Sequence, residues 1–217
     1  MKNFKARFFH HLLLSIDGII NPCLTDWYNN EHIPLRLNHL PSFLTGARFS
    51  ASDSKTPTWL AVYDITDTSA FSDESYTRLR SSRSQREADL VARLEMLDRR
   101  TCVLVQDSGE SGVTTSLGAE KPTHFLCTHG LDVGGDNDEE AGRWAKRSFE
   151  ELGRDVDGWV RTRVFKVLDH SVVGTAVEKA QPVSPYFVVH GASFDERELF
   201  AVLTRVSVQN SCSQLWL

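Results

Sequence analysis

Residues 26–36 read Asp-Trp-Tyr-Asn-Asn-Glu-His-Ile-Pro-Leu-Arg, and the rest of the chain is organised around this stretch. Pro34 has no backbone N–H to donate, so we expect the helix that carries these residues to break, or to start a new first turn, near the proline. Tyr28, His32 and Arg36 are spaced four residues apart, which places them on one face of a helix. The stretch therefore predicts a helical segment with an aromatic, a titratable and a cationic side chain on the same side.

The segments around this stretch alternate between strand-like and helical patterns. Residues 68–100 carry Leu90, Leu94 and Leu97 at helical spacing and predict a helical region in two pieces. The resulting order, β-α-β-β-α-β, is that of a ferredoxin-like unit, in which both helices cover one face of a four-stranded antiparallel sheet. The expected strands are residues 5–16, 43–50, 59–66 and 101–106, and the first helix ends at Pro41.

Residues 123–217 repeat the same plan at low identity. At an offset of 116 residues, Tyr28 corresponds to Trp144 and Phe43 to Trp159, and apolar residues match through a strand, a helix and a strand. The expected strands of this half are residues 124–132, 159–168, 186–194 and 208–217, with helices at 136–152 and 195–206.

The predicted fold class is α+β, with two ferredoxin-like repeats in one chain. Residues 1–106 form the first repeat and the active half, and residues 123–217 form the second repeat and the structural half. Residues 107–122, rich in Ser, Gly and Thr, are expected to be a linker. A ferredoxin-like unit leaves one sheet face bare, and two antiparallel sheets that face each other cover both faces and remove exposed edges. We therefore expect an α/β barrel, either as a monomer or as a homodimer of tandem repeats.

The composition is typical of a soluble globular protein, with 41% hydrophobic and 24% charged residues. The net charge of −5, without a basic stripe, argues against a nucleic-acid partner. No apolar run reaches the roughly 18 residues of a membrane span, and the scattered cysteines indicate a reducing compartment, so we expect a cytoplasmic protein without membrane contact. The arginine cluster is interpreted as a solvated helix face and comprises Arg78, Arg80, Arg83 and Arg86.

The sequence contains no metal or nucleotide motif. The eight histidines include no HxH or HExxH spacing, and the cysteines include no CxxC. The glycine-rich residues 130–135 match neither a P-loop nor GxGxxG. We therefore expect neither a metal nor a bound nucleotide.

His32 is the first candidate for a catalytic residue. Histidine titrates near neutrality and is the commonest general acid or base. Tyr28 can offer a phenolic hydrogen bond, and Arg36 can hold an anionic group or an enolate. The alternative interpretation is a histidine that only satisfies local backbone groups beside the break at Pro34.

Further candidates lie on the expected strands. Because strand side chains alternate, one of His10 and His11 faces the helices and the other faces the barrel interior, and the sequence leaves open which of them lines a pocket. Tyr63 lies on the third strand, normally beside the first in this fold, where it can act as an acid, serve as an oxyanion donor or simply pack against an aromatic neighbour. Trp27 and Tyr28 suit a flat, apolar ligand.

The string Trp27-Tyr28-Asn29-Asn30-Glu31-His32-Ile33-Pro34-Leu35 resembles the W/Y-x-x-x-H-x-P-L signature of the EthD-like branch of the dimeric α/β-barrel superfamily. The end of the first half, from Arg86-Glu87 to Leu97-Asp98-Arg99-Arg100, is similar to fungal members of that group. The match covers residues 5–106. The second half is similar only in plan, since Ser148 stands where His32 stands in the first half. The resemblance implies that His32 is a pocket residue and that the second half completes the barrel.

The same resemblance implies an enzyme without a cofactor, because members of the superfamily are typically cofactor-free lyases, cyclases, isomerases, decarboxylases or monooxygenases. Their substrates are aromatic and polyketide-type carbonyl compounds, so the expected partner is a small hydrophobic or aromatic carbonyl compound. The first hypothesis is an enzyme of secondary metabolism in which His32 deprotonates a carbon acid next to a carbonyl, followed by cyclisation, dehydration or decarboxylation. The alternatives are a cofactor-free monooxygenase that acts on an electron-rich aromatic compound, and a non-catalytic small-molecule-binding or stress-response barrel. The predicted catalytic residues are His32 and Tyr63, and the predicted substrate-binding residues are Trp27, Tyr28, Arg36, His10 and His11.

Overall fold

Eight antiparallel strands form one continuous sheet in the described part of the chain, which comprises residues 8–16, 22–109, 123–193 and 213–216 of a computed structural model. The strands are β1 (Phe8–Ile16), β2 (Phe43–Ser50), β3 (Trp59–Ile65), β4 (Leu94–Asp107), β5 (Phe125–Leu131), β6 (Trp159–Val173), β7 (Tyr186–Ala192) and β8 (Ser213–Trp216). Their order in the sheet is β2-β3-β1-β4-β6-β7-β5-β8. The pairing of β4 with β6 therefore joins the two halves of the chain.

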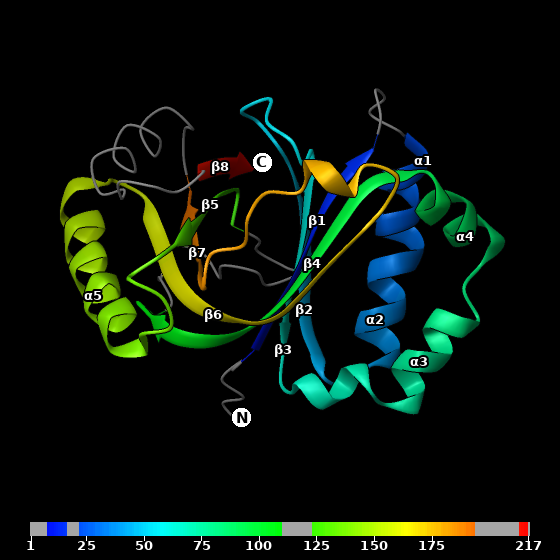
Figure 1. The fold of residues 1–217 in the computed structure, drawn as a ribbon, viewed down its shortest axis with the longest axis horizontal. Coiled ribbons are helices and arrows are strands. Elements are labelled where there is room, and N and C mark those ends of the chain that lie inside the picture. The colour runs from blue at the N-terminus through cyan, green and yellow to red at the C-terminus, as the bar shows by residue number, and fades with distance from the viewer. Residues whose placement is uncertain (1–7, 17–21, 110–122, 194–212, 217) are drawn as a thin grey trace.

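The helices of both halves pack against the outer face of the curled sheet. Between β1 and β2 the chain forms α1 (Pro22–Trp27), the π-helical turn η1 (Tyr28–His32) and α2 (Ile33–His39). Between β3 and β4 it forms η2 (Thr68–Phe71), α3 (Glu74–Ser81) and α4 (Gln85–Ala92), while α5 (Asp138–Asp155) joins β5 to β6 and η3 (Val177–Lys179) precedes β7. Figure 1 shows the sheet curling through the middle of the molecule, with α2, α3 and α4 on one side and α5 on the opposite side.

The fold is α+β, as predicted. The first half has the strand order β2-β3-β1-β4, with helices after β1 and after β3, and the second half has the order β6-β7-β5-β8, with α5 after β5. Strand β2 has the predicted bounds, and β6 continues to Val173, past its predicted end at Leu168. The predicted helix at residues 195–206 lies outside the described residues, so the second ferredoxin-like repeat remains a prediction.

The helix predicted over residues 68–100 is too long, because β4 already begins at Leu94. The pairing of β4 with β1 shifts register at Glu95, which is the extra residue of a β-bulge. Because of this extra residue, Leu94 and Leu97 face the same side and pack in one apolar cluster with the helices. Their three-residue spacing resembles a helical period but results from the bulge.

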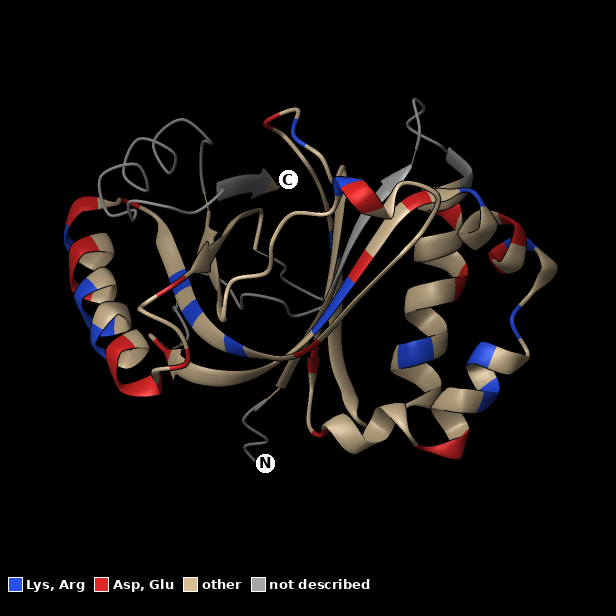
Figure 2. Ribbon diagram, in the orientation of Figure 1, with Lys and Arg blue, Asp and Glu red and all other residues tan. Residues whose placement is uncertain are grey.

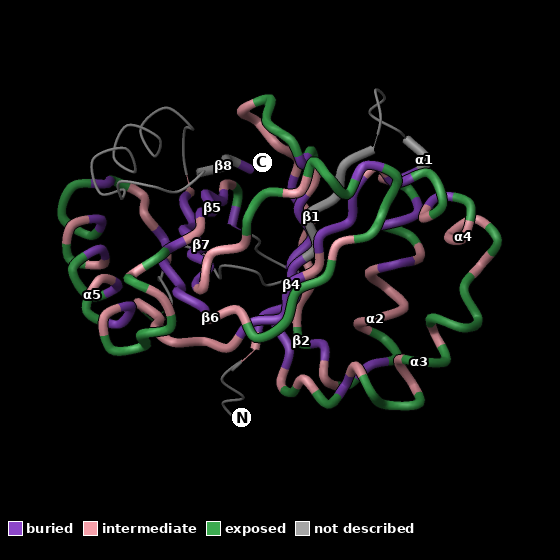
Figure 3. The backbone as a smooth tube through the Cα atoms, viewed as in Figure 1, coloured by how far each residue is buried: buried purple, intermediate pink, exposed green. Residues whose placement is uncertain are grey.

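Apolar side chains from both halves fill the inside of the curled sheet. Phe9 of β1 stacks on Phe165 of β6 with ring centroids 4.5 Å apart. Ala51, just after β2, forms a single bridge with Trp216 of β8, so the two edges of the sheet meet there. Figure 3 shows the central strands as the most buried part of the backbone. The buried residues of this interior are Phe9, Phe49, Leu60, Val62, Cys102, Leu126, Phe165, Phe187, Val189 and Trp216.

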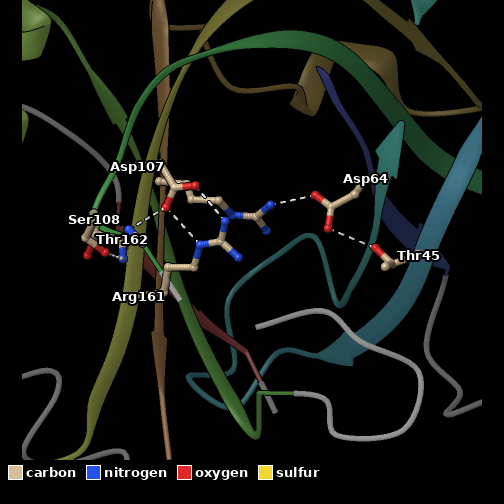
Figure 4. A network of polar contacts seen from close by, with 8 residues as sticks. Thr45, Asp64, Asp107, Ser108, Arg161 and Thr162 are labelled. Atoms are coloured by element: carbon tan, nitrogen blue, oxygen red, sulfur yellow. Dashed lines mark hydrogen bonds and ion pairs between the residues drawn. The ribbon is translucent and has the colours of Figure 1, made fainter. Parts of the chain in front are cut away.

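An ion pair crosses this interior between β3 and β6. Arg163 donates to Asp64 at 2.5 Å, and Thr45 Oγ1 donates to the other carboxylate oxygen of Asp64 at 2.9 Å (Figure 4). The exposed fractions of the Arg163 and Asp64 side chains are only 5% and 12%. Because buried charges lose their hydration, each partner is stabilised there chiefly by the other.

The start of the predicted linker is attached to β6. Asp107, the last residue of β4, accepts two hydrogen bonds from Arg161 at 2.8 and 2.6 Å (Figure 4). The backbone N–H of Thr162 donates to Ser108 Oγ at 2.9 Å. Asp107 and Ser108 are therefore fixed to the sheet, and the rest of the predicted linker from residue 110 on lies outside the described residues.

A buried hydrogen-bond chain in the second half fixes the protonation of two histidines. His129 Nδ1 lies 2.9 Å from the Gly130 carbonyl, which only accepts, so His129 donates there and its Nε2 is left as an acceptor. His190 Nε2 lies 3.1 Å from this atom and donates to it, and His190 Nδ1 accepts from Thr162 Oγ1 at 2.8 Å. All the hydrogen bonds of this chain of side chains form while both imidazole rings are neutral. A proton added to either ring removes the ring nitrogen that accepts one of these bonds.

We expect stability to fall as the pH drops from 7.5 to 5.5. Burial lowers the pKa of His10 to about 3. Burial also lowers the pKa of four other histidines: His11, His32, His129 and His190. The unfolded chain therefore binds more protons than the folded chain when the pH falls to the ordinary histidine pKa and below it. Each such histidine contributes up to about 1.4 kcal/mol of lost stability per pH unit in this window. The urea midpoint measured across this pH range should therefore decrease steadily with acidity.

In the His190→Gln variant, the free energy of unfolding should change less steeply with pH, by the equivalent of about one bound proton. A midpoint that stays constant or rises between pH 7.5 and 5.5 would contradict the expected neutrality of these buried rings.

Gly174 lies beside the bulge of β4 and tolerates no side chain. Its φ is +144°, and a Cβ atom built there would lie 2.2 Å from the carbonyl oxygen of Glu95, a backbone atom that cannot rotate away. We expect Gly174→Ala to lower the free energy of unfolding by about 1–3 kcal/mol. Gly134→Ala is the matched control, since Gly134 also has a positive φ but has open space around it, and it should cost less in the same urea titration. Equal costs for the two variants would show that the contact with Glu95 does not matter.

Candidate functional site

The break predicted near Pro34 is present as a π-helical turn. The N–H of Ile33 donates to the carbonyl of Tyr28, five residues earlier, and Pro34 lies in the first turn of α2. A π-helical turn brings residues five apart onto one side, and single turns of this kind are frequent at functional sites. The rings of Trp27 and Tyr28 consequently both contact His32, with ring centroids 4.4 and 4.6 Å from the imidazole.

A cavity of about 80 Å³ lies next to this turn, between the helices of the first half and the outer face of the sheet. Five of the seven predicted site residues line it: His10, Trp27, Tyr28, His32 and Arg36. Several other lining residues were not predicted from the sequence, among which are Phe43, Tyr76, Arg80, Arg83, Glu87 and Arg99. The cavity thus combines aromatic walls with several cationic side chains.

His32 is buried beside this cavity without a hydrogen-bond partner on either ring nitrogen among the described residues. Burial is the main reason why its pKa lies well below the ordinary histidine value, and the nearby guanidinium groups of Arg36 and Arg99 lower it further. The ring is therefore neutral at physiological pH and has one nitrogen able to accept a proton. A buried polar group without a partner is uncommon and calls for an explanation, which a ligand in the cavity would provide.

The structure decides between His10 and His11. His10 faces the helices, lines the cavity and contacts Thr101 Oγ1 through Nδ1 at 3.1 Å. His11 faces the interior of the curled sheet, where its ring stacks on Phe187 at a centroid distance of 4.0 Å. The substrate-binding role predicted for His11 therefore has no geometric support, because the sheet separates it from the cavity.

Tyr63 lies on the same sheet face as His10 but is not part of the cavity wall. The two residues are paired across β1 and β3, and the Tyr63 ring is fully buried with an edge contact to Phe43 at 5.5 Å. Burial raises the pKa of its hydroxyl, which has no hydrogen-bond partner within the described ranges. The geometry favours the packing interpretation of Tyr63 over the catalytic one.

The arginine cluster interpreted as a solvated face has two roles. Arg80 and Arg83 are exposed, as predicted, but they also border the cavity. Arg86 forms an ion pair with Asp26 at 2.7 Å and ties α4 to α1. The signal that could have identified Arg99 is strand alternation, because Leu97 and Arg99 share one face of β4 and both line the cavity.

No group of three or more His, Cys, Asp or Glu side chains in the described ranges is arranged to hold a metal ion. None of the described helices is long and apolar enough to cross a membrane.

Comparison with known proteins places the fold. No family model matches the chain, and no curated protein matches its sequence. Among solved structures, an "anthrone oxidase-like protein" aligns over 98% of this chain and 91% of its own, with a TM-score of 0.61 and 11% identity. The chain has the dimeric α/β-barrel type of fold.

Two further structures of this fold are named "putative monooxygenase". The protein from Fusobacterium nucleatum aligns over 97% of this chain and 91% of its own, with a TM-score of 0.60 and 9% identity. The protein from Lactobacillus acidophilus aligns over 98% and 94%, with a TM-score of 0.51 and 8% identity. At these identities the likeness concerns the fold alone, and membership of the EthD-like branch remains a prediction.

Proposed function

We propose that the protein is a cofactor-free monooxygenase that oxidises an acidic carbon of an electron-rich aromatic carbonyl compound, with His32 as the general base. The observation that carries the proposal is the buried imidazole of His32, which has no hydrogen-bond partner within the described ranges and borders a cavity with aromatic walls. The names of the structures that share the fold support oxidation over the cyclisation, dehydration or decarboxylation considered first.

The proposed reaction begins with the transfer of a proton from the acidic carbon to His32. The resulting carbanion is delocalised into the ring and onto the carbonyl oxygen, and the guanidinium groups of Arg36 and Arg99 stabilise that negative charge. Dioxygen then accepts the electrons. For a CH₂ group that becomes a carbonyl, one oxygen atom enters the product and the other leaves as water with the two hydrogens.

The negative charge that develops on the substrate during proton transfer also makes His32 a better base. In the empty cavity, burial and two arginines hold its pKa low, which weakens its affinity for a proton. The negative charge that develops on the substrate offsets the arginines and raises the pKa of the imidazole at the moment of transfer. The same arginines therefore stabilise both the carbanion and the neutral resting state of the base.

The cavity must widen to admit a ring, because its volume of about 80 Å³ is well below the roughly 300–1,000 Å³ of typical ligand pockets. The boundary best able to move is formed by α3 and the start of α4. Helix α3 has no buried residue, and α4 has only Leu90. We expect the substrate to enter by displacing these helices outward.

The second half contributes structure in this proposal. Ser148 of α5 is buried at the position that corresponds to His32, and Trp144 packs edge-on against His129, with ring centroids 5.7 Å apart. We propose that residues 123–217 are a second ferredoxin-like repeat, which the strand order β6-β7-β5-β8 supports. Both halves already cover the interior of one curled sheet, so the proposal accommodates a monomer as well as a homodimer.

The test is oxygen consumption with anthrone, a tricyclic ketone whose acidic CH₂ lies opposite its carbonyl. The proposal predicts one dioxygen consumed per anthraquinone formed, above the rate in buffer, and no product under nitrogen. Turnover of carbonyl substrates that proceeds equally without oxygen would instead support the cyclisation or elimination class. Binding of anthrone without any turnover would support the non-catalytic barrel.

A further inference from the structure

Four arginine side chains converge on the cavity from different elements. Arg36 comes from α2, Arg80 from α3, Arg83 from the connection between α3 and α4, and Arg99 from β4. Figure 2 shows basic segments on α2 and α3 where these two helices lie on the same side of the sheet. Among the described residues of the cavity wall, Glu87 is the one carboxylate, so positive charge predominates.

The described part of the protein does not pair these four guanidinium groups with a carboxylate. Across the ranges that the structure describes, none of them has a carboxylate oxygen within 4.0 Å. Arg36 Nη1 instead donates to the backbone carbonyl of His32 at 3.0 Å, and Arg83 Nε donates to that of Arg80 at 3.0 Å. Backbone carbonyls orient these side chains but leave their charge uncompensated.

The arginines on the opposite face of the same sheet show the contrast. Arg100 is paired with Asp98 at 2.7 Å and Arg163 with Asp64 at 2.5 Å. Pairing is the usual condition for a buried cation, because an unpaired one loses its hydration without compensation. Arg99 directly precedes Arg100 and is only partly exposed. It faces the cavity and has no carboxylate partner among the described residues, so it departs from this rule.

Glu87 is a weak counter-charge. It is partly buried on α4, and burial raises the pKa of its carboxyl group despite the nearby Arg36, Arg83 and Arg99. The cavity therefore lacks most of the negative charge that would balance its arginines.

We propose that the substrate enters this cavity as an anion, a planar aromatic compound with a carboxylate that Arg99 and Arg36 hold beside His32. The inference rests on the proposed function and specifies its substrate class. A guanidinium group binds a carboxylate through two parallel hydrogen bonds, which fixes the ring as well as the charge. Trp27, Tyr28 and Phe43 supply the walls for the ring. Arg80 and Arg83, exposed at the mouth, attract anions from solution.

The experiment compares benzoate with benzamide, which have the same shape and differ in charge, by isothermal titration calorimetry on the whole chain. Benzoate should bind at least about tenfold more tightly, and its affinity should fall as salt is added. Arg99→Met should weaken benzoate binding about tenfold or more, and Arg99→Lys, which keeps the charge, should weaken it less. Arg93→Met, at an exposed position at the end of α4, should bind benzoate like the unchanged protein. Urea titration shows that each variant is folded.

Equal affinity for the two compounds, binding of neither, or unchanged benzoate affinity in a folded Arg99→Met variant would overturn the inference. Different results would overturn the proposed function and this inference. Arg99-dependent binding of benzoate would stand even if no compound caused oxygen consumption. Oxidation of anthrone by a protein that binds benzoate no more tightly than benzamide would leave the proposed function and remove the anionic substrate.

Discussion

Replacing His32 by Gln is expected to lower kcat/KM for the oxidised substrate by about 10²–10⁴-fold, the usual contribution of a general base. Gln has a similar volume and can still form hydrogen bonds, but it cannot accept a proton. The ring of His32 has no hydrogen-bond partner in the described part of the protein, so its replacement breaks no internal contact of that kind. Steady-state kinetics of oxygen consumption measure the loss.

The matched control for this variant is His39→Gln, on the exposed end of α2, which should keep full activity. Circular dichroism and the urea midpoint should show that both variants are folded. Activity of His32→Gln within twofold of the unchanged protein would exclude His32 as the base.

Replacing Arg163 by Met is expected to lower the free energy of unfolding by about 3–5 kcal/mol, because it leaves the buried carboxylate of Asp64 without its cation. The hydrogen bond from Thr45 remains, but a neutral donor cannot compensate the charge. The effect should be large because Arg163 also packs over the rings of Phe9 and Phe165, at 5.1 and 5.3 Å, and thereby connects both halves of the chain. Urea unfolding at neutral pH provides the measurement.

Arg143→Met is the control for this prediction. Arg143 lies on the exposed surface of α5, paired with Glu139 and Glu140, and its loss should cost no more than about 0.5 kcal/mol. The double variant Asp64→Leu with Arg163→Met should recover much of the lost stability, because it removes both charges together. A loss below about 1 kcal/mol for Arg163→Met would show that the pair does not hold the halves together.

The sequence predicted most strands because their signals are local. The alternation in residues 59–66 and the polar loop before them predicted β3, which ends one residue earlier, at Ile65. The bounds of β2 followed from Pro41 and the polar run after Ser50. The start of β4 was missed because a β-bulge places Leu94 and Leu97 at a helix-like spacing. Whether a residue is bulged depends on the partner strand, which local spacing does not reveal.

The candidate site was predicted where its residues lie on one helical segment. Tyr28, His32 and Arg36 share a face because of their spacing, and the proline marked the break that became a π-helical turn. Arg99 and Glu87 were missed because they reach the cavity from elements far away in the sequence. Which of His10 and His11 faces the cavity depends on the side of the sheet that the helices cover, and this is a property of the whole fold.

The most direct test of the account is the exchange of the acidic hydrogen of anthrone with D₂O in the absence of oxygen, followed by proton NMR. This measurement isolates the proton transfer that we assign to His32 from the later reaction with oxygen. We expect the unchanged protein to accelerate the loss of this signal above the rate in buffer and His32→Gln not to do so. Equal exchange rates with the unchanged protein and with a folded His32→Gln variant would contradict this expectation.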